Sequence, residues 1–220
     1  MLEVKKMNIR ESETSLFNEW QGNRKGFVKD GVVSVNDYLL LNPKIAFIFK
    51  EVNDLGGGGW DLREFIAKGG LPQTWDNVAR WVHGIRNINS IPDWSCYSEI
   101  TNEFRVDVLK SICVINLKKS PGTHTTDKAT LNTVANEDKI FIQKQYQIYN
   151  PDLTICGGTG DLFKRVAGFG QKKWKTTKRG IRYFERESNQ YVVSFAHPEA
   201  RVQDSLLVYG LLDTINEISA

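Results

Sequence analysis

Four short apolar runs constrain the fold of this chain more than any other feature of its sequence. They span residues 44–49, 108–117, 152–156 and 192–195, and segments with helical spacing of apolar residues lie between them. Short buried strands that alternate with helices are typical of a parallel sheet with helices on both faces. We therefore expect an α/β fold with a central, mainly parallel, four-stranded sheet.

Length and composition are those of one globular unit. Hydrophobic residues make up 40% and charged residues 25% of the 220 residues, which is enough apolar surface for one packed core. We expect residues 1–220 to form a single domain, with residues 1–42 as an N-terminal helical extension packed on it. Neither a leader nor an apolar run of membrane-spanning length is found, so we expect a cytoplasmic monomer without membrane contacts.

The cysteines give no indication of a disulfide framework or a zinc site. Cys96, Cys113 and Cys156 are widely spaced and form no CxxC pair, and two of them lie in apolar runs. We expect no metal and no cofactor.

Polar residues and glycines follow the ends of the four runs. In chain order they are Glu51 and Asn53, then Asn116, then Gly157, Gly158 and Thr159, and finally His197. Ligands of open α/β sheets bind outside the carboxyl ends of the strands, so these positions are candidates for a functional site. The alternative for His197, which precedes a proline, is a structural histidine that satisfies a buried carbonyl group.

Four consecutive glycines, residues 56–59, follow the first apolar run. They match neither a P-loop, which needs a terminal Lys-Ser/Thr, nor a dinucleotide-binding GxGxxG motif. A flexible tether is one interpretation. The position directly after a buried strand favours a functional loop.

A basic block extends from Lys164 to Arg186, where nine basic residues stand against one acidic residue in a chain of net charge +3. Phe169, Trp174 and Tyr183 are interleaved with the charges. Such a block is typical either of contact with a polyanion, with bases stacked on the aromatic rings, or of a solvated hairpin whose aromatic side chains pack inward.

Several of these segments together resemble motifs of the uracil-DNA glycosylase superfamily. The matching segments, which lie between about Pro43 and the C-terminus, are Val114-Ile115-Asn116-Leu117-Lys118-Lys119-Ser120-Pro121, Tyr149-Asn150-Pro151 with the following strand and Gly157-Gly158-Thr159, Lys178-Arg179-Gly180, and His197-Pro198-Glu199-Ala200-Arg201. The resemblance lies in the order of the motifs rather than in dense identity.

The resemblance implies a three-layer α/β/α sandwich that binds duplex or single-stranded DNA, flips one base and hydrolyses its N-glycosidic bond, the base being uracil or another deaminated base. It implies catalytic roles for Glu51, which would activate water, and for His197, which would stabilise the departing base. The base would be bound by Asn116, Trp60, Phe65 and Asn53. The DNA backbone would contact Lys118, Ser120, Gly157, Gly158, Thr159, Lys172, Lys173, Lys175, Arg179 and Arg201.

The first motif departs from the family pattern. It usually begins with glycine and contains a proline, whereas this chain has Lys50-Glu51-Val52-Asn53-Asp54. The four cysteines that hold an iron–sulfur cluster in one branch have no counterpart, so no cluster is expected. Two alternatives therefore remain open, a non-catalytic nucleic-acid-binding protein of the same fold and a small nucleotide or nucleoside hydrolase.

Overall fold

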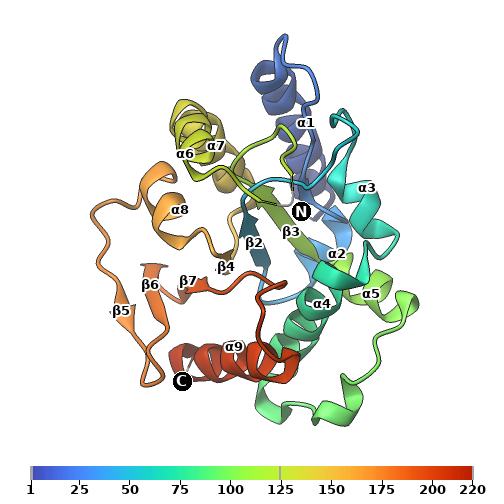
Figure 1. Ribbon diagram of the computed structural model, residues 1–220, viewed down its shortest axis with the longest axis vertical. Helices are drawn as coiled ribbons and strands as arrows, with labels where there is room; N and C mark the ends of the chain where they lie inside the picture. The colour runs from blue at the N-terminus through green and yellow to red at the C-terminus, as the bar shows by residue number, and fades with distance from the viewer. Residues whose placement is uncertain (1, 124, 220) are drawn as a thin grey trace.

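The computed structural model describes residues 2–123 and 125–219, and its centre is one mixed sheet with strand order β1-β3-β2-β4-β7-β6-β5 (Figure 1). The strands are β1 (Gly31–Val32), β2 (Ile45–Phe49), β3 (Ile112–Asn116), β4 (Leu153–Gly157), β5 (Lys175–Thr176), β6 (Arg182–Glu187) and β7 (Gln190–Phe195). Strands β3, β2, β4 and β7 are parallel to one another, and β1, β5 and β6 pair antiparallel at the two edges. The α/β class is confirmed.

The prediction of a four-stranded sheet is wrong, because the sheet has seven strands. Strands β1 and β5 have only two residues each, too few for an alternating pattern to be recognised in the sequence. Strand β6 forms a hairpin with β7, and its turn contains Asn189 with a positive φ of 60°. Strand β1 lies within residues 1–42, so the segment predicted as a helical extension also supplies an edge strand of the sheet.

Helices lie on both faces of the sheet (Figure 1). Side chains of α3 (Leu62–Ala67), α4 (Pro72–Arg86), α5 (Asn102–Leu109) and α9 (Asp204–Ser219) belong to the core on one face. Side chains of α1 (Leu2–Gln21), α2 (Val35–Leu40), α6 (Lys128–Glu137), α7 (Lys139–Tyr149) and α8 (Gly160–Val166) belong to the core on the other. None of the helices in the described part of the chain has the length and apolar character needed to cross a bilayer.

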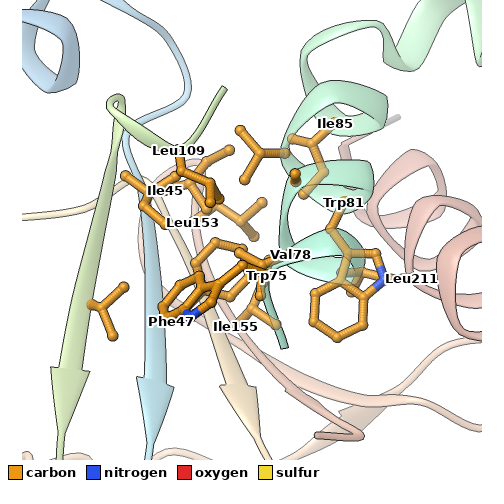
Figure 2. Close-up of a cluster of buried hydrophobic side chains, with 14 of the residues drawn as sticks. Ile45, Phe47, Trp75, Val78, Trp81, Ile85, Leu109, Leu153, Ile155 and Leu211 are labelled. Atoms are coloured by element: carbon orange, nitrogen blue, oxygen red, sulfur yellow. The ribbon is translucent and has the colours of Figure 1, made fainter. Parts of the chain in front are cut away.

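Alternation along the central strands divides the side chains between these two cores. In β2, Ile45, Phe47 and Phe49 face α4, whereas Ala46 and Ile48 face the opposite layer. Figure 2 shows Phe47 among the α4 side chains Trp75 and Trp81. The buried Trp81 indole donates a hydrogen bond of 3.1 Å to the Leu207 carbonyl and so ties α4 to α9.

The strand order places a topological switch point between β2 and β4. Strand β2 leads through α3, α4 and α5 to its neighbour β3, whereas β4 leads through α8, β5 and β6 to β7 on the other side. Because the connections leave in opposite directions, a crevice is expected outside the carboxyl ends of β2 and β4. A ligand site is therefore expected at and beyond Phe49 and Gly157.

Candidate functional site

The last residues of three parallel strands form a row on the α4 side of the sheet. Asn116 of β3 pairs in register with Phe49 of β2, and Gly157 of β4 lies on the other side of Phe49. A Cβ atom on Gly157 would lie 2.6 Å from Phe49 Cε1, so only glycine leaves room for the ring there. The row thus consists of an amide, an aromatic ring and a bare stretch of backbone.

His197 lies beside this row, directly after β7. Its ring centroid is 5.4 Å from that of Phe49, and its Nδ1 accepts a hydrogen bond of 3.2 Å from the Glu199 backbone N–H. Burial lowers the pKa of His197 below its usual value, so the imidazole is neutral at pH 7. Since Nδ1 is an acceptor, the hydrogen of the neutral ring is on Nε2, and His197 offers one N–H donor.

Asn116 is only 3% exposed, and its position is fixed through its backbone. Its N–H donates a hydrogen bond of 2.7 Å to Asp30 Oδ2. Among residues 2–123 and 125–219, no hydrogen bond involves its side-chain amide. This amide can therefore donate to and accept from the polar edge of a planar ligand.

Glu51, the second residue after β2, forms an ion pair with Lys118 from the segment after β3. Glu51 Oε2 lies 2.7 Å from Lys118 Nζ, which also donates to the Pro121 carbonyl at 3.1 Å. The Glu51 side chain is only 5% exposed. The pair holds a largely desolvated carboxylate in one place at the carboxyl edge of the sheet.

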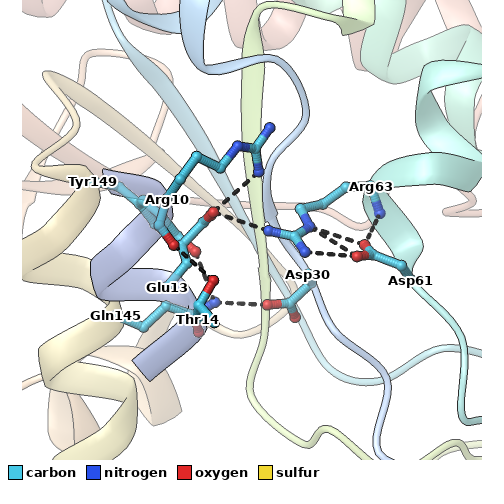
Figure 3. Close-up of polar contacts among 8 residues, drawn as sticks. All are labelled: Arg10, Glu13, Thr14, Asp30, Asp61, Arg63, Gln145 and Tyr149. Carbon is cyan, nitrogen blue, oxygen red and sulfur yellow. Dashed lines mark hydrogen bonds and ion pairs between the residues drawn. The ribbon is translucent and has the colours of Figure 1, made fainter. Parts of the chain in front are cut away.

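A second, fully buried ion pair lies behind Asn116. Lys119 Nζ is 2.6 and 2.7 Å from the two carboxylate oxygens of Asp30 and 2.9 Å from Gln145 Oε1. Gln145 Nε2 in turn donates to Asp30 at 2.7 Å, as Figure 3 shows. Because Asp30 also accepts the Asn116 N–H, this cluster fixes the end of β3 relative to α7.

The glycine run is an ordered loop rather than a tether. Asp54 accepts hydrogen bonds from the backbone N–H groups of Gly56 and Gly58, at 2.7 and 2.9 Å, and from Trp60 Nε1 at 2.8 Å. The Trp60 bond and the two backbone bonds lower the pKa of Asp54. A Cβ atom on Gly58 would lie 2.2 Å from the Gly26 carbonyl oxygen, so two backbone segments touch here.

Trp60 and Phe65, the predicted stacking residues, belong to this loop and to α3. Their rings contact each other with centroids 5.8 Å apart. Asn53, the remaining predicted base-binding residue, is exposed and forms an isolated bridge with Gly122. The aromatic ring in register with Asn116 is that of Phe49 instead.

Several groups predicted to hold DNA phosphates are engaged within the protein. Lys118 pairs with Glu51, the Gly158 N–H donates to the Phe195 carbonyl at 2.9 Å, and Thr159 Oγ1 donates to the Ile48 carbonyl at 2.7 Å. Ser120 is partly buried in the turn after β3, and Arg201 is exposed in the loop before α9. Phosphate binding by these residues stays a prediction.

The basic block does not gather around the site. Lys172 Nζ donates to the Arg186 carbonyl at 2.8 Å, near the amino end of β7, with Lys173 next to it in the chain. Lys175 is exposed in β5, and Arg179 Nε lies 3.1 Å from Asp213 of α9. The block therefore extends along the outer edge of the sheet, from the amino end of β7 to its carboxyl end.

Two residues of the site were not predicted from the sequence, Phe49 and Lys50. Phe49 is the last residue of a strand whose alternate residues face α4, so aligning the strand ends would have placed it beside Asn116. Lys50 directly precedes Glu51, and its Cε lies 3.9 Å from the position of a Cβ atom on Gly158. Its side chain thus extends from β2 toward β4, across the switch point.

Within the described residues, no group of three or more histidine, cysteine, aspartate or glutamate side chains could hold a metal ion. The groups that the site offers for chemistry are an amide, a carboxylate, an imidazole and lysines. Comparison with known proteins gives no family that matches the chain, and no curated protein matches it.

Proposed function

We propose that this protein hydrolyses the N-glycosidic bond of a flipped uracil or other deaminated base in DNA, as a member of the uracil-DNA glycosylase superfamily with an atypical first motif. The observation that carries the proposal is the arrangement at the switch point. The Glu51 carboxylate, the Asn116 amide, which has no side-chain hydrogen bond among the described residues, and the neutral His197 imidazole lie at or just beyond the ends of three parallel strands, and Asn116 and His197 flank the ring of Phe49.

Each part of this arrangement suits one step of base excision. Asn116 would read the polar edge of the base, and Phe49 would contact its face. Glu51, held in place by Lys118, would orient and activate the water that attacks the anomeric carbon. The Nε2–H of His197 would donate to a carbonyl oxygen of the base as negative charge develops on it.

One observation favours a second candidate, a nucleoside or nucleotide hydrolase. Lys172 lies near the amino end of β7, whereas His197 follows its carboxyl end, so part of the basic block is remote from the site. A small substrate needs no such block. The two functions differ in substrate length, because a DNA glycosylase requires contacts with flanking phosphates and its binding weakens with salt by about 0.9 in log K per phosphate contact.

The test is a base-release assay on oligonucleotides that carry uracil, hypoxanthine, xanthine or mismatched thymine, with uridine and deoxyuridine in parallel. Wild type is compared with Glu51→Gln, His197→Ala and the matched control Glu64→Gln, an exposed carboxylate on α3. We expect release from an oligonucleotide, a loss of about 100-fold or more in the first two variants and none in the control.

The other outcomes separate the alternatives. Release from free nucleosides alone would identify the small-substrate hydrolase. No release from any substrate, together with salt-dependent DNA binding, would identify the non-catalytic binding protein. Equal activity of Glu51→Gln and wild type would refute the assigned role of Glu51.

A further inference from the structure

Three lysines lie at the carboxyl edge of the parallel strands, and they differ in their partners. Lys118 pairs with Glu51 at 2.7 Å, and Lys119 pairs with Asp30 at 2.6 Å. Lys50 is partly buried and makes no ion pair with any residue that the structure describes. Lys50 is therefore a positive charge at this edge without a counterion among the described residues, and such a charge favours an anionic ligand.

The placement of Lys50 links it to the imidazole. Its side chain passes beside Gly158, where its Cε lies 3.9 Å from the position that a Cβ atom would occupy. Burial is the main cause of the lowered pKa of His197, and the positive charge of Lys50 acts in the same direction. Glu199, which acts in the opposite direction, is exposed.

We propose that Lys50 is a further catalytic residue, whose ammonium group holds the negative charge that develops on the departing base while His197 donates a hydrogen bond. The inference rests on the proposed function and deepens it, since it names the ligand at these strand ends as the anionic form of a planar pyrimidine. A neutral imidazole can orient such a base but brings no charge of its own. Lys50 is itself partly buried, and an ammonium group that is partly screened from water stabilises an anion more than one in bulk solvent.

This role belongs to this chain in particular, because Lys50 stands where the first motif of the resembling family begins with glycine. The bond that breaks is the one between the anomeric carbon and the base nitrogen, and its electron pair leaves with the base. Water adds to the anomeric carbon and gives up its proton to the Glu51 carboxylate. The base anion then takes up a proton from solvent and Glu51 releases its proton to solvent, so that atoms and charges balance and the carboxylate is restored.

The experiment measures binding of two probes, neutral uracil and barbiturate, a pyrimidine that is anionic at neutral pH. Titration calorimetry is carried out on the whole protein in complex with an oligonucleotide that contains an abasic site. Wild type is compared with Lys50→Met, Lys50→Arg and the control Lys68→Met, which changes an exposed lysine at the end of α3. Thermal unfolding of each variant shows whether it is folded.

We expect wild type and the control to prefer barbiturate to uracil, and Lys50→Met to lose about tenfold or more of that preference while its affinity for uracil is unchanged. Lys50→Arg should keep the preference. Failure of wild type to bind barbiturate, or equal weakening of both probes by Lys50→Met, would overturn the proposal. The base-release assay decides the proposed function separately, because a preference that depends on Lys50 can be measured whether or not any base is released.

Discussion

Gly122 faces the carboxylate of Glu51 so closely that a Cβ atom at position 122 would lie 2.4 Å from Glu51 Oε1. The two segments are also joined through their backbones, because the Gly122 N–H donates to the Val52 carbonyl at 2.8 Å and the Asp54 N–H donates to the Gly122 carbonyl at 3.3 Å. Together with the ion pair to Lys118, these contacts fix Glu51 from two sides.

Gly122→Ala should therefore act on activity more than on folding. The new methyl group forces the Glu51 carboxylate out of its position. A displacement of a catalytic group by about 1 Å costs roughly 100-fold in rate. Base release is the measurement, with Gly170→Ala as the control, since no atom lies within 4 Å of a Cβ there. Full activity of Gly122→Ala would show that the position of Glu51 is not critical.

Asp30→Asn should destabilise the protein strongly. The change removes the counterion of Lys119, whose side chain is only 1% exposed, and an uncompensated buried charge costs about 3–5 kcal/mol. Urea unfolding measures the loss. The double variant Asp30→Asn/Lys119→Met should recover part of it, because it leaves no unpaired charge, and a double variant no more stable than Asp30→Asn would contradict this account.

Acid should destabilise the protein through two partly buried histidines. Burial lowers the pKa of both His197 and His83 in the folded state. As pH falls through the unfolded value of about 6.5, the unfolded chain binds protons that the folded chain does not, so the free energy of unfolding decreases. This stability is fully present above about pH 6.5 and is lost as pH falls toward the folded pKa values.

The contribution of His197 can be separated from that of His83 with the variant His197→Asn. Urea unfolding at about pH 7.5 and pH 5.5 should show a smaller acid destabilisation in this variant than in wild type, because only the His83 contribution remains. The same difference in both proteins would mean that His197 binds protons equally well in the folded and unfolded states.

Neutralising Lys172 and Lys173 should leave DNA binding almost unchanged. The Lys172 ammonium donates to the Arg186 carbonyl near the amino end of β7, away from the strand ends that carry the site. The slope of log K against log salt for Lys172→Gln/Lys173→Gln should match that of wild type. A decrease in its magnitude by about 0.9 per lysine would show that these residues contact phosphates.

The central strands could be predicted because each is encoded locally. The apolar runs at 44–49 and 152–156 correspond to β2 (Ile45–Phe49) and β4 (Leu153–Gly157), since a run of buried residues bounded by turn residues specifies a strand without reference to the rest of the chain. The edge strand β1 was missed for the opposite reason. Residues 31–32 become β1 only because β3 lies beside them.

The same division applies to the site. The ends of β2, β3, β4 and β7 indicated Glu51, Asn116, Gly157 and His197 as neighbours of one edge, because the carboxyl ends of parallel strands meet there. The sequence also suggested Trp60 as a stacking residue, although its indole is bound to Asp54 in the glycine loop. To choose the stacking residue, one must know which aromatic ring lies beside Asn116. The register between β2 and β3 decides this, and it places Phe49 there.

The sequence by itself determined that this chain forms an α/β fold with polar residues at the ends of parallel strands, since strand length, alternation and turn residues are local properties. Only the tertiary structure decided which charges are paired and which is not. Lys118 and Glu51 are 67 positions apart, and Lys119 and Asp30 are 89 apart. Such contacts follow from the order β3-β2-β4-β7, which brings distant segments together, and this order left Lys50 beside Gly158 without a counterion among the described residues.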